Sequence, residues 1–232
     1  MQQESQQDAW KRMAGEEAIK YIESGMVIGI GSGSTAAMMV QALARRLRDG
    51  LSIAGAVPTS QATTQLALSL GIPLTDLDAH PELDLAIDGT DEIDSHLFLI
   101  KGGGGALLRE KIVATASRRF LVIADSTKIV SKLGSKAPVP VETVPFAIAP
   151  VRRRLELLGA RVQLRQRGGR TFITDNSNVI LDCFFDNGID DAPALERQMH
   201  SIVGLVETGL FLNMAERAII GGASGVQVMM RR

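Results

Sequence analysis

Apolar residues in the first half of the chain follow two alternating patterns. Short continuous runs end at glycine, and longer stretches place an apolar residue every three to four positions. The first pattern is typical of buried strands and the second of helices that pack by one face. The pattern predicts a helix over 10–24, followed by strands and helices over 26–50, 51–71, 83–89, 97–119 and 120–125. This alternation indicates an α/β fold, with an open, mostly parallel sheet covered on both faces.

The second half of the chain has a different rhythm. Prolines at 138, 140 and 145 interrupt a segment without a strand-helix repeat. Beyond them the pattern predicts a small α+β unit with helices over 151–160 and 192–204 and antiparallel strands over 161–166, 171–175 and 178–185. The tail is expected to rejoin the first sheet. The predicted domains are therefore 1–133 with 208–232, and 134–207.

Composition favours a small polar partner over a nucleic acid or a membrane. The 232 residues carry 25 Lys and Arg against 26 Asp and Glu, so the net charge attracts neither nucleic acid nor an anionic lipid surface. The first 25 residues lack the apolar core of a secretory signal, and no apolar run approaches a membrane span. We therefore expect a cytoplasmic protein. Cys183 is the single cysteine, cannot form an internal disulfide, and is expected to be packed within its strand.

Seven arginines gather between positions 152 and 170. RNA binding calls for aromatic residues among them, and none precedes Phe172. Acidic residues follow soon after, at 182, 186, 190 and 191. We interpret the cluster as a solvated or subunit-facing surface.

The turn "GIGSGST" lies between a predicted strand and a predicted helix. It fits a dinucleotide site poorly, because Ser34 stands where the third glycine is required and no carboxylate ends the next strand. Ser32, Gly33, Ser34 and Thr35 nevertheless place hydroxyls and N–H groups at a helix start, where the helix dipole favours an anion. A phosphate site is the preferred interpretation, and a helix cap with a tight turn is the alternative.

Acidic residues follow the strand over 83–89. Asp88, Gly89, Thr90, Asp91 and Glu92 are expected at the sheet edge where open α/β proteins bind ligands. A magnesium site and a turn capped by aspartate are both possible there. The magnesium site is disfavoured because His80 and His96 lack a ligand spacing, and because Lys101 would repel a cation.

Lysine, four glycines and a glutamate follow the apolar run 97–100. The ammonium of Lys101 is therefore expected at the same edge as Asp88. The loop from Gly102 through Gly103 and Gly104 to Gly105 can bring N–H groups close to substrate oxygens and turn into the helix that carries Glu110. Glu110 is the candidate general base, and a surface glutamate is the alternative. These residues suggest cofactor-independent proton transfer in a phosphorylated sugar, as in an aldose-ketose isomerase.

The segments "GIGSGSTA", "DGTDEID", "KGGGGALLREK" and "ADSTK" together resemble the signature segments of ribose-5-phosphate isomerase type A. The later segments "VPVETVPF", "TDNSNVILDC" and "VETGLF" extend the resemblance over nearly the whole chain. The resemblance implies interconversion of D-ribose 5-phosphate and D-ribulose 5-phosphate in the non-oxidative pentose phosphate pathway, without a metal. It also implies a Rossmann-like domain with an inserted ferredoxin-like domain, and a homodimer or homotetramer with the small domain at the subunit interface.

The resemblance assigns roles to residues that match the motifs. Glu110 matches the proton acceptor, Asp88 and Asp91 match the pair that binds substrate hydroxyls, and Lys101 matches the lysine that supports the enediolate. The residues that match substrate-contacting positions are Ser32–Thr35, Asp88–Asp91, Lys101–Gly104 and Lys128. Lys11 is a weaker match to a phosphate contact. Residues 1–7 are expected to be a frayed extension.

Two rival functions remain at this point. A sugar-phosphate-sensing regulator of related fold would need a helix-turn-helix, for which the segment before Met26 leaves no room. A related enzyme, such as an aminosugar-phosphate deaminase or a CoA transferase, is the other alternative. The deaminase would require a catalytic histidine, which the motif-bearing segments lack.

Overall fold

The computed structural model describes residues 5–231, and the chain folds into two compact units. Unit 1 holds the residues up to Thr90, Arg109–Lys128 and the residues from Met214 onward, and unit 2 holds Asp91–Leu108 and Ile129–Asn213. Residues 91–108 thus group with the second unit, whereas the sequence placed them in the first. The further prediction that the smaller unit lies at a subunit interface stays a prediction.

Unit 1 is built around a six-stranded sheet in the order β15-β14-β6-β3-β1-β2. Every neighbouring pair is parallel except β14 and β15, which form the hairpin by which the tail rejoins the sheet, as predicted. Its elements are α1 (Gln6–Ala18), η1 (Ile19–Tyr21), β1 (Val27–Ile30), α2 (Ser34–Arg48), β2 (Gly55–Pro58), α3 (Gln61–Ser69), β3 (Leu85–Gly89), the larger part of α4 (Leu107–Thr115), β6 (Phe120–Asp125), η2 (Ser126–Lys128), β14 (Arg217–Gly222) and β15 (Gly225–Met230).

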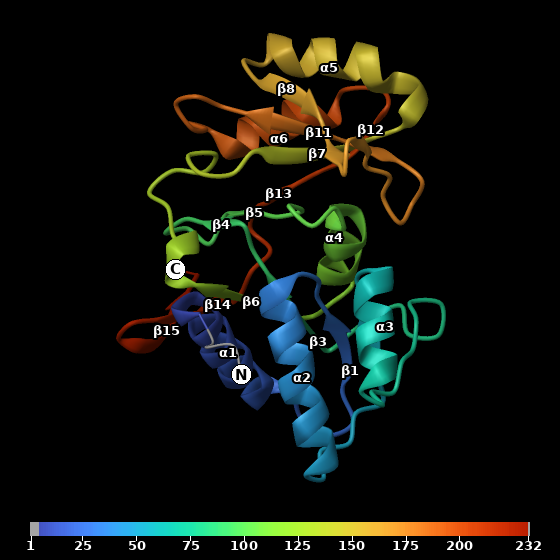
Figure 1. The fold of residues 1–232 in the computed structure, drawn as a ribbon, viewed down its shortest axis with the longest axis vertical. Coiled ribbons are helices and arrows are strands. Elements are labelled where there is room, and N and C mark those ends of the chain that lie inside the picture. Colours follow the sequence, from blue (N-terminus) through green and yellow to red (C-terminus); the bar gives the residue numbers. More distant parts are fainter. Residues whose placement is uncertain (1–4, 232) are drawn as a thin grey trace. The chain divides into compact units, whose positions relative to one another are not determined.

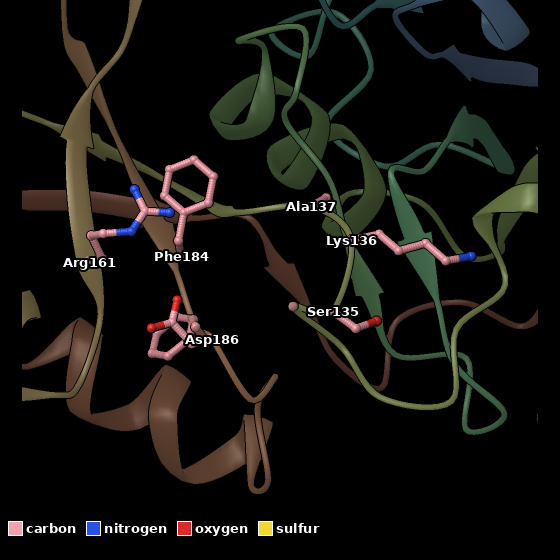
Figure 2. A pocket seen from close by; sticks show the side chains of 8 residues that line it. Ser135, Lys136, Ala137, Arg161, Phe184 and Asp186 are labelled. Atoms are coloured by element: carbon pink, nitrogen blue, oxygen red, sulfur yellow. The ribbon is translucent and has the colours of Figure 1, made fainter.

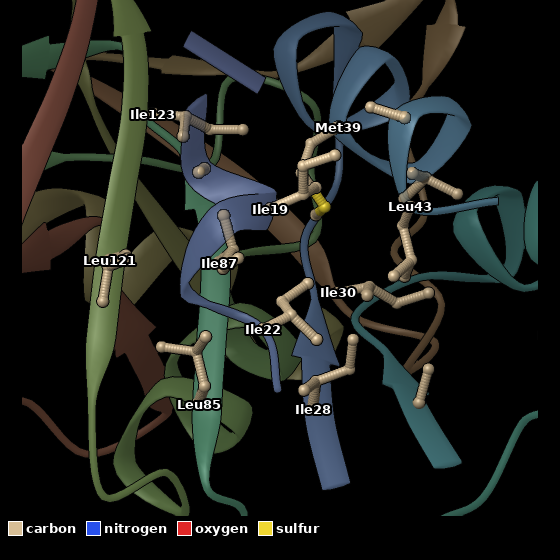
Figure 3. Packing of buried hydrophobic residues seen from close by; sticks show 14 of the residues in the cluster. Ile19, Ile22, Ile28, Ile30, Met39, Leu43, Leu85, Ile87, Leu121 and Ile123 are labelled. Carbon is tan, nitrogen blue, oxygen red and sulfur yellow. The ribbon is translucent and has the colours of Figure 1, made fainter. Parts of the chain in front are cut away.

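Alternate strand residues of unit 1 face opposite helical layers. Ile28, Ile30 and Ile87 point to the face covered by α1 and α2, which lie side by side over the sheet, and join one buried apolar cluster with residues of these helices (Figures 1 and 3). Gly29 points to the other face, where an added Cβ would collide with Val113 of α4. The two-residue period of a strand therefore produces the predicted sheet with both faces covered.

Unit 2 contains an antiparallel four-stranded sheet in the order β12-β7-β11-β8. With two helices in the chain order β-α-β-β-α-β, this is the expected ferredoxin-like arrangement. The elements of unit 2 are β4 (Glu92–Ile93), β5 (Leu99–Ile100), β7 (Val139–Thr143), η3 (Pro145–Ala147), α5 (Ile148–Leu157), β8 (Arg161–Leu164), β9 (Gln166–Arg167), β10 (Arg170–Thr171), β11 (Val179–Phe184), α6 (Ala192–His200), β12 (Leu205–Thr208) and β13 (Leu210–Phe211).

Two expectations about elements were wrong, and a strand in the proline-rich segment was missed. The proline-rich segment contains a strand, β7, and its Pro140 is paired with Asp182 of β11. The run 97–100 does not enter the parallel sheet, because β5 pairs antiparallel with β4 and β13 in a separate small sheet. The range 171–175 does not form a continuous strand, since only β10 and a single bridge at Ile173 occur there.

The N-terminal helix begins earlier than expected. Ser5 caps α1 by accepting a hydrogen bond from the N–H of Asp8, so Gln6 and Gln7 are helical and not frayed. Residues 1–4 of the expected extension lie outside the described part of the chain. Cys183 is fully buried in β11, as predicted, and this burial, with Asp182 adding to it, raises the pKa of its thiol well above the ordinary value.

Candidate active site

The ends of β1 and β3 meet at the point where the strand order of unit 1 reverses. The chain runs from β1 to β2 on one side and then returns to β3 on the other, which makes this the ligand-binding position of open α/β sheets. A Cβ at Gly31 would lie 2.6 Å from Cα of Asp88, so the turn after β1 passes against the end of β3. Oδ1 of Asp88 accepts hydrogen bonds from the N–H of Ser32 at 3.0 Å and of Gly89 at 2.7 Å.

The Ser32 hydroxyl joins a cluster of hydroxyls at the start of α3. Its Oγ lies 2.7 Å from Thr59 Oγ1, 2.7 Å from Ser60 Oγ and 3.1 Å from Thr63 Oγ1. Thr63 in turn donates to the carbonyl of Gly31 at 3.0 Å. Sequence reasoning placed the Ser32 hydroxyl at the start of α2 and missed the other three residues, although the density of Ser and Thr after Pro58 was a visible signal. The cluster ties the first glycine turn to a second helix N-terminus.

The N-terminus of α2 is open. Gly33 is its N-cap and has φ +93°. In the described part of the chain no side-chain cap bonds to the first N–H groups, which include those of Ser34 and Thr35. Unsatisfied N–H groups at the positive end of a fifteen-residue helix favour an anion. This supports the phosphate interpretation over a side-chain cap.

Glu110 occupies the first turn of α4, as the sequence predicted. It is only 5% exposed, which excludes the surface-glutamate alternative. Val113, three residues later on the same helix face, packs over Gly29 of β1. A helix that crosses between parallel strands begins at their carboxyl edge, so Glu110 lies towards the edge at which β1 and β3 end.

Lys128 ends η2, directly after β6. The turn is held by Asp125, whose Oδ1 accepts from the N–H of Thr127 at 3.0 Å and from its hydroxyl, while Oδ2 accepts from Gln7 at 3.2 Å. Lys128 is half-buried. Lys11 pairs with Asp8 at 3.2 Å. The carboxylate of Asp125 therefore connects α1 to the loop that carries Lys128.

Lys101 belongs to unit 2 and is 2% exposed. Its N–H donates to the carbonyl of Gly209 at 2.9 Å, and its Nζ lies 5.2 Å from the centre of the Phe211 ring. Because β5 belongs to a separate sheet, the premise that Lys101 ends a strand of the Asp88 sheet was wrong. Lys101 is buried beside Phe211 of β13.

The glycine loop of unit 2 is tightly packed at three of its four positions. Added Cβ atoms would meet Leu107 at Gly102 and the Phe172 ring at Gly105, and both glycines have positive φ. The N–H of Gly103 donates to Oδ2 of Asp91 at 2.7 Å. Gly104 alone faces open space. The structure thus brings Asp91 and the loop together.

One member of the arginine cluster is not a solvated surface residue. The Arg165 side chain is 11% exposed and pairs with Asp182 through both its Nε and Nη2. Its Nη1 donates to the carbonyls of Gly102 at 2.8 Å and Gly103 at 3.1 Å. The solvated alternative was therefore wrong for Arg165, and sequence reasoning missed its contact with the glycine loop. The subunit-facing alternative stays a prediction.

A separate pocket of about 180 Å³ lies in unit 2 and contains none of the predicted site residues. Arg161 stacks over the Phe184 ring at 4.4 Å, and the Lys136 side chain points away from both (Figure 2). The nearby N–H groups of Lys136 and Ala137 already donate to the buried carboxylate of Glu92. These two N–H groups are therefore already paired within the protein.

Two searches over the described residues returned nothing. Among residues 5–231, no group of three or more His, Cys, Asp or Glu is arranged to hold a metal ion. In that same part of the chain, none of the helices has both the length and the apolar character that a membrane span needs.

Comparison with known proteins identifies the family. The model of the ribose 5-phosphate isomerase A family, also called phosphoriboisomerase A, matches residues 55–225. The chain belongs to this family. A ribose-5-phosphate isomerase A from Roseiflexus castenholzii is 52% identical over 219 residues, which cover 94% of this chain and 93% of the relative. A second relative, from Bacillus mycoides, is 49% identical over 94% of this chain and 97% of its own length.

Solved structures of ribose-5-phosphate isomerases share the fold. A D-ribose-5-phosphate isomerase in complex with phospho-erythronic acid superposes with a TM-score of 0.94 at 38% identity, covering 98% of this chain and all of that one. The ribose 5-phosphate isomerase A of Methanocaldococcus jannaschii gives 0.91 at 40% identity, covering 96% of this chain and 99% of its own. Family membership makes the chain an aldose-ketose isomerase, which agrees with the function implied by the motifs.

Proposed function

We propose that this isomerase interconverts D-ribose 5-phosphate and D-ribulose 5-phosphate through an enediolate, with Glu110 as the base that moves the proton. Family membership carries the isomerase activity. The observation that supports Glu110 is its burial in the first turn of α4, at the carboxyl edge of the unit 1 sheet. A carboxylate held away from water is suited to removing a weakly acidic proton from carbon.

The proton balance of the proposed reaction is simple. The Glu110 carboxylate takes the proton from C2 of the open-chain aldose, and the electron pair of the broken C–H bond forms the C1–C2 double bond of an enediolate. The electron pair of the C1 carbonyl moves onto O1, and the proton of the O2 hydroxyl then passes to O1. The protonated Glu110 delivers its proton to C1 as O2 becomes the ketose carbonyl. No atom is gained or lost, so no external oxidant or reductant is needed.

The remaining site residues are proposed to bind the two ends of the sugar. Lys101 and N–H groups of the loop Gly102–Gly104 would stabilise the negative charge on the enediolate oxygens. Asp88 and Asp91, with Gly89 and Thr90 between them, would bind substrate hydroxyls. The turn Ser32–Thr35 and Lys128 would hold the phosphate, supported by the open N-terminus of α2.

Kinetics with ribose 5-phosphate test this proposal directly. Ketose formation should persist in excess chelator. Glu110→Gln should lower kcat by about 10² to 10⁴ because the base is lost while substrate binding is retained. Lys101→Ala should lower the rate by about 10² or more.

An isotope measurement isolates the role of Glu110. In D₂O the unmodified enzyme should exchange the C2 proton of ribose 5-phosphate, and Glu110→Gln should not. Glu82→Gln is a matched control, because Glu82 is exposed and its carboxylate pairs with Arg118 at 2.9 Å. Exchange that continues at the normal rate in Glu110→Gln would remove Glu110 as the base.

Several further statements remain proposals that the family resemblance supports. They are a place in the non-oxidative pentose phosphate pathway, a cytoplasmic location, assembly as a homodimer or homotetramer with the small unit at the subunit interface, and the absence of nucleic acid or membrane partners. The comparisons support the isomerase and not the non-catalytic sugar-phosphate-binding regulator. Chromatography with light scattering would determine the number of subunits.

A further inference from the structure

A largely buried ion pair between Arg165 and Asp182 contacts the carbonyl side of the glycine loop of unit 2. The Arg165 guanidinium donates to two consecutive loop carbonyls and, on its other edge, to Asp182. We infer that Arg165 and Asp182 form a positioning pair that sets the orientation of the loop Gly102–Gly104 and of Asp91 for the isomerase reaction. This inference rests on the proposed function of that loop.

The planar trans peptide explains how a grip on carbonyls controls the N–H groups. In each peptide unit the C=O and the following N–H point in opposite directions. Arg165 holds the carbonyl of Gly102, so the N–H of Gly103 points away from it and donates to Oδ2 of Asp91 at 2.7 Å. One guanidinium contact therefore fixes the donor that orients the Asp91 carboxylate.

The next peptide unit is held in the same way. Arg165 Nη1 also binds the carbonyl of Gly103, which turns the N–H of Gly104 away from the arginine. Within residues 5–231 no protein acceptor receives this N–H, and Gly104 is exposed. The pair thus presents one oriented donor, of the kind that stabilises a developing oxyanion, and it does so before substrate binds.

Arg165 is itself fixed by the sheet of unit 2. It follows β8, and its N–H donates to the carbonyl of Ile180 in β11 at 2.9 Å. Asp182 lies two residues further along β11 and is 15% exposed. A two-pronged bond to a carboxylate leaves Nη1 aimed in one direction, which a lysine ammonium cannot reproduce. Through Arg165, the position of the loop is therefore fixed relative to the sheet of unit 2.

A second pair of contacts closes the far end of the loop. Arg167 stacks on the Phe172 ring at 4.5 Å, and its Nη2 lies 3.4 Å from the carbonyl of Gly104. The same ring fills the space beside Gly105. These contacts limit movement at the end of the loop, but Arg167 is exposed, so the main orienting force comes from Arg165.

Conservative substitutions test the pair without removing charge. Arg165→Lys keeps a cation opposite Asp182 but cannot bind both carbonyls. We expect kcat/KM for ribose 5-phosphate to fall by about 10- to 100-fold, mostly in kcat, because misplacing catalytic groups by about 1 Å has an effect of this size. The matched control is Arg161→Lys in β8, the strand that Arg165 follows. The Arg161 side chain stacks on Phe184, and kcat/KM of the control should stay within about twofold of the original.

Hydrogen exchange of peptides that cover residues 101–108 gives a readout independent of activity. Arg165→Lys should accelerate exchange in this loop while Arg161→Lys does not. Asp182→Asn leaves both carbonyl contacts of Arg165 possible and should produce a smaller change of the same sign. It also carries the test if Arg165→Lys fails to fold.

The outcomes separate the two proposals. Absence of turnover in the unmodified protein would refute the proposed function, and exchange would still report whether the pair holds the loop. A folded Arg165→Lys with unchanged exchange and kcat/KM would overturn the positioning role. Equal losses of activity and thermal stability in Arg165→Lys and Arg161→Lys would also overturn it, because the effect would then be general to the strand.

Discussion

The two glycine turns of the molecule both lead into a helix, but they are held in different ways. In the first turn, the backbone of Gly31 packs directly against Asp88 of the neighbouring strand β3. The Ser32 hydroxyl bonds to a cluster of other hydroxyls. In the loop Gly102–Gly105, the Arg165 guanidinium instead donates hydrogen bonds to the carbonyls of Gly102 and Gly103. The first turn is part of the packing of unit 1. The second is packed at its two ends, Gly102 and Gly105, and is positioned between them by polar contacts within unit 2.

This difference predicts that substitutions in the first turn act mainly on folding stability, and substitutions in the middle of the loop mainly on the reaction rate. Backbone pressed against backbone cannot be altered without moving a strand, because interiors are close-packed. A loop held by two hydrogen bonds can shift while the sheet behind it stays folded. Changes at the first turn should therefore lower stability, whereas changes at the middle loop residues Gly103 and Gly104 should act on the reaction rate more than on stability.

Gly31→Ala should have the largest effect. The added Cβ would lie 2.6 Å from Cα of Asp88 and would also collide with its carboxyl group. We expect a loss of at least about 3 kcal/mol in unfolding free energy, beyond the usual cost of overpacking, or failure to fold. Urea unfolding measures this loss.

Gly104→Ala is the comparison for Gly31→Ala. It meets nothing within 4 Å and has no positive φ. Its stability should be unchanged or higher by about 0.4–1 kcal/mol, because alanine reduces the entropy of the unfolded chain. Equal stability losses at the two positions would remove the distinction between packed turn and held loop.

The second largest effect is expected at Gly105, where packing and backbone strain act together. Gly105 has φ +95°, and an alanine there would overlap the Phe172 ring. Gly105→Ala should destabilise by about 1–3 kcal/mol, as overpacking does. Adding Phe172→Ala should recover part of this loss by removing the ring but not the backbone strain. A double variant no more stable than Gly105→Ala would show that Phe172 is not the obstacle.

Sequence patterns predicted the elements that bury long apolar stretches. The strands ending at Ile30, Gly89 and Asp125 are continuous apolar runs, so their burial on both faces was readable. Asp88 was a candidate because it lies near the end of such a strand, and Glu110 because its helix follows the glycine run; their roles stay predictions. Sequence patterns can therefore identify residues that lie close in sequence to a strand or helix with a clear apolar pattern.

Contacts that depend on strand register were not predictable. Arg165 meets Asp182 because β8 and β11 pair with Asp182 opposite Gln163, and no local pattern encodes that pairing. Pro140 concealed β7 because proline lacks a ladder donor. The Pro140 carbonyl accepts from the N–H of Gly209, which lies beyond the end of β12. In a strand the nitrogen of a residue points to the same side as its carbonyl, so no strand of the sheet requires an N–H from Pro140. The two-residue strands β4 and β5 are too short to show any period.

Gly103→Ala should change rate more than stability. Its Cβ would lie 2.8 Å from Oδ1 and 3.0 Å from Oδ2 of Asp91, and a carboxylate at the end of a side chain can move aside. We expect kcat/KM for ribose 5-phosphate to fall about tenfold or more, since Asp91 is displaced, with a melting temperature close to the original. Retained kcat/KM would indicate that the orientation of Asp91 is unimportant.

The smallest expected effect comes from an ion pair that does not contact the glycine loop. Its loss shows how much the removal of an ordinary ion pair changes stability and kcat/KM, for comparison with Arg165→Lys. Glu216 in unit 1 accepts from Arg119 Nε at 2.8 Å and from Arg217, and these hydrogen bonds hold the pKa of its carboxyl below the ordinary 4.5. A lowered folded pKa means that the pair stabilises the protein above pH 4.5 and loses this effect as the pH falls through the folded pKa. Glu216→Gln should therefore cost less than about 1 kcal/mol near pH 7, because all three side chains are partly exposed.

Thermal unfolding of Glu216→Gln and the original protein should converge as the pH drops below 4.5, with kcat/KM unchanged at pH 7. A gap that widened in acid would contradict the sign of the pKa shift. If Glu216→Gln lowered kcat/KM as much as Arg165→Lys, then loss of any ion pair would slow the enzyme. The grip of Arg165 on the loop would then have no special bearing on catalysis, since Glu216 joins β14 to the residue before β6 and touches none of the loop glycines.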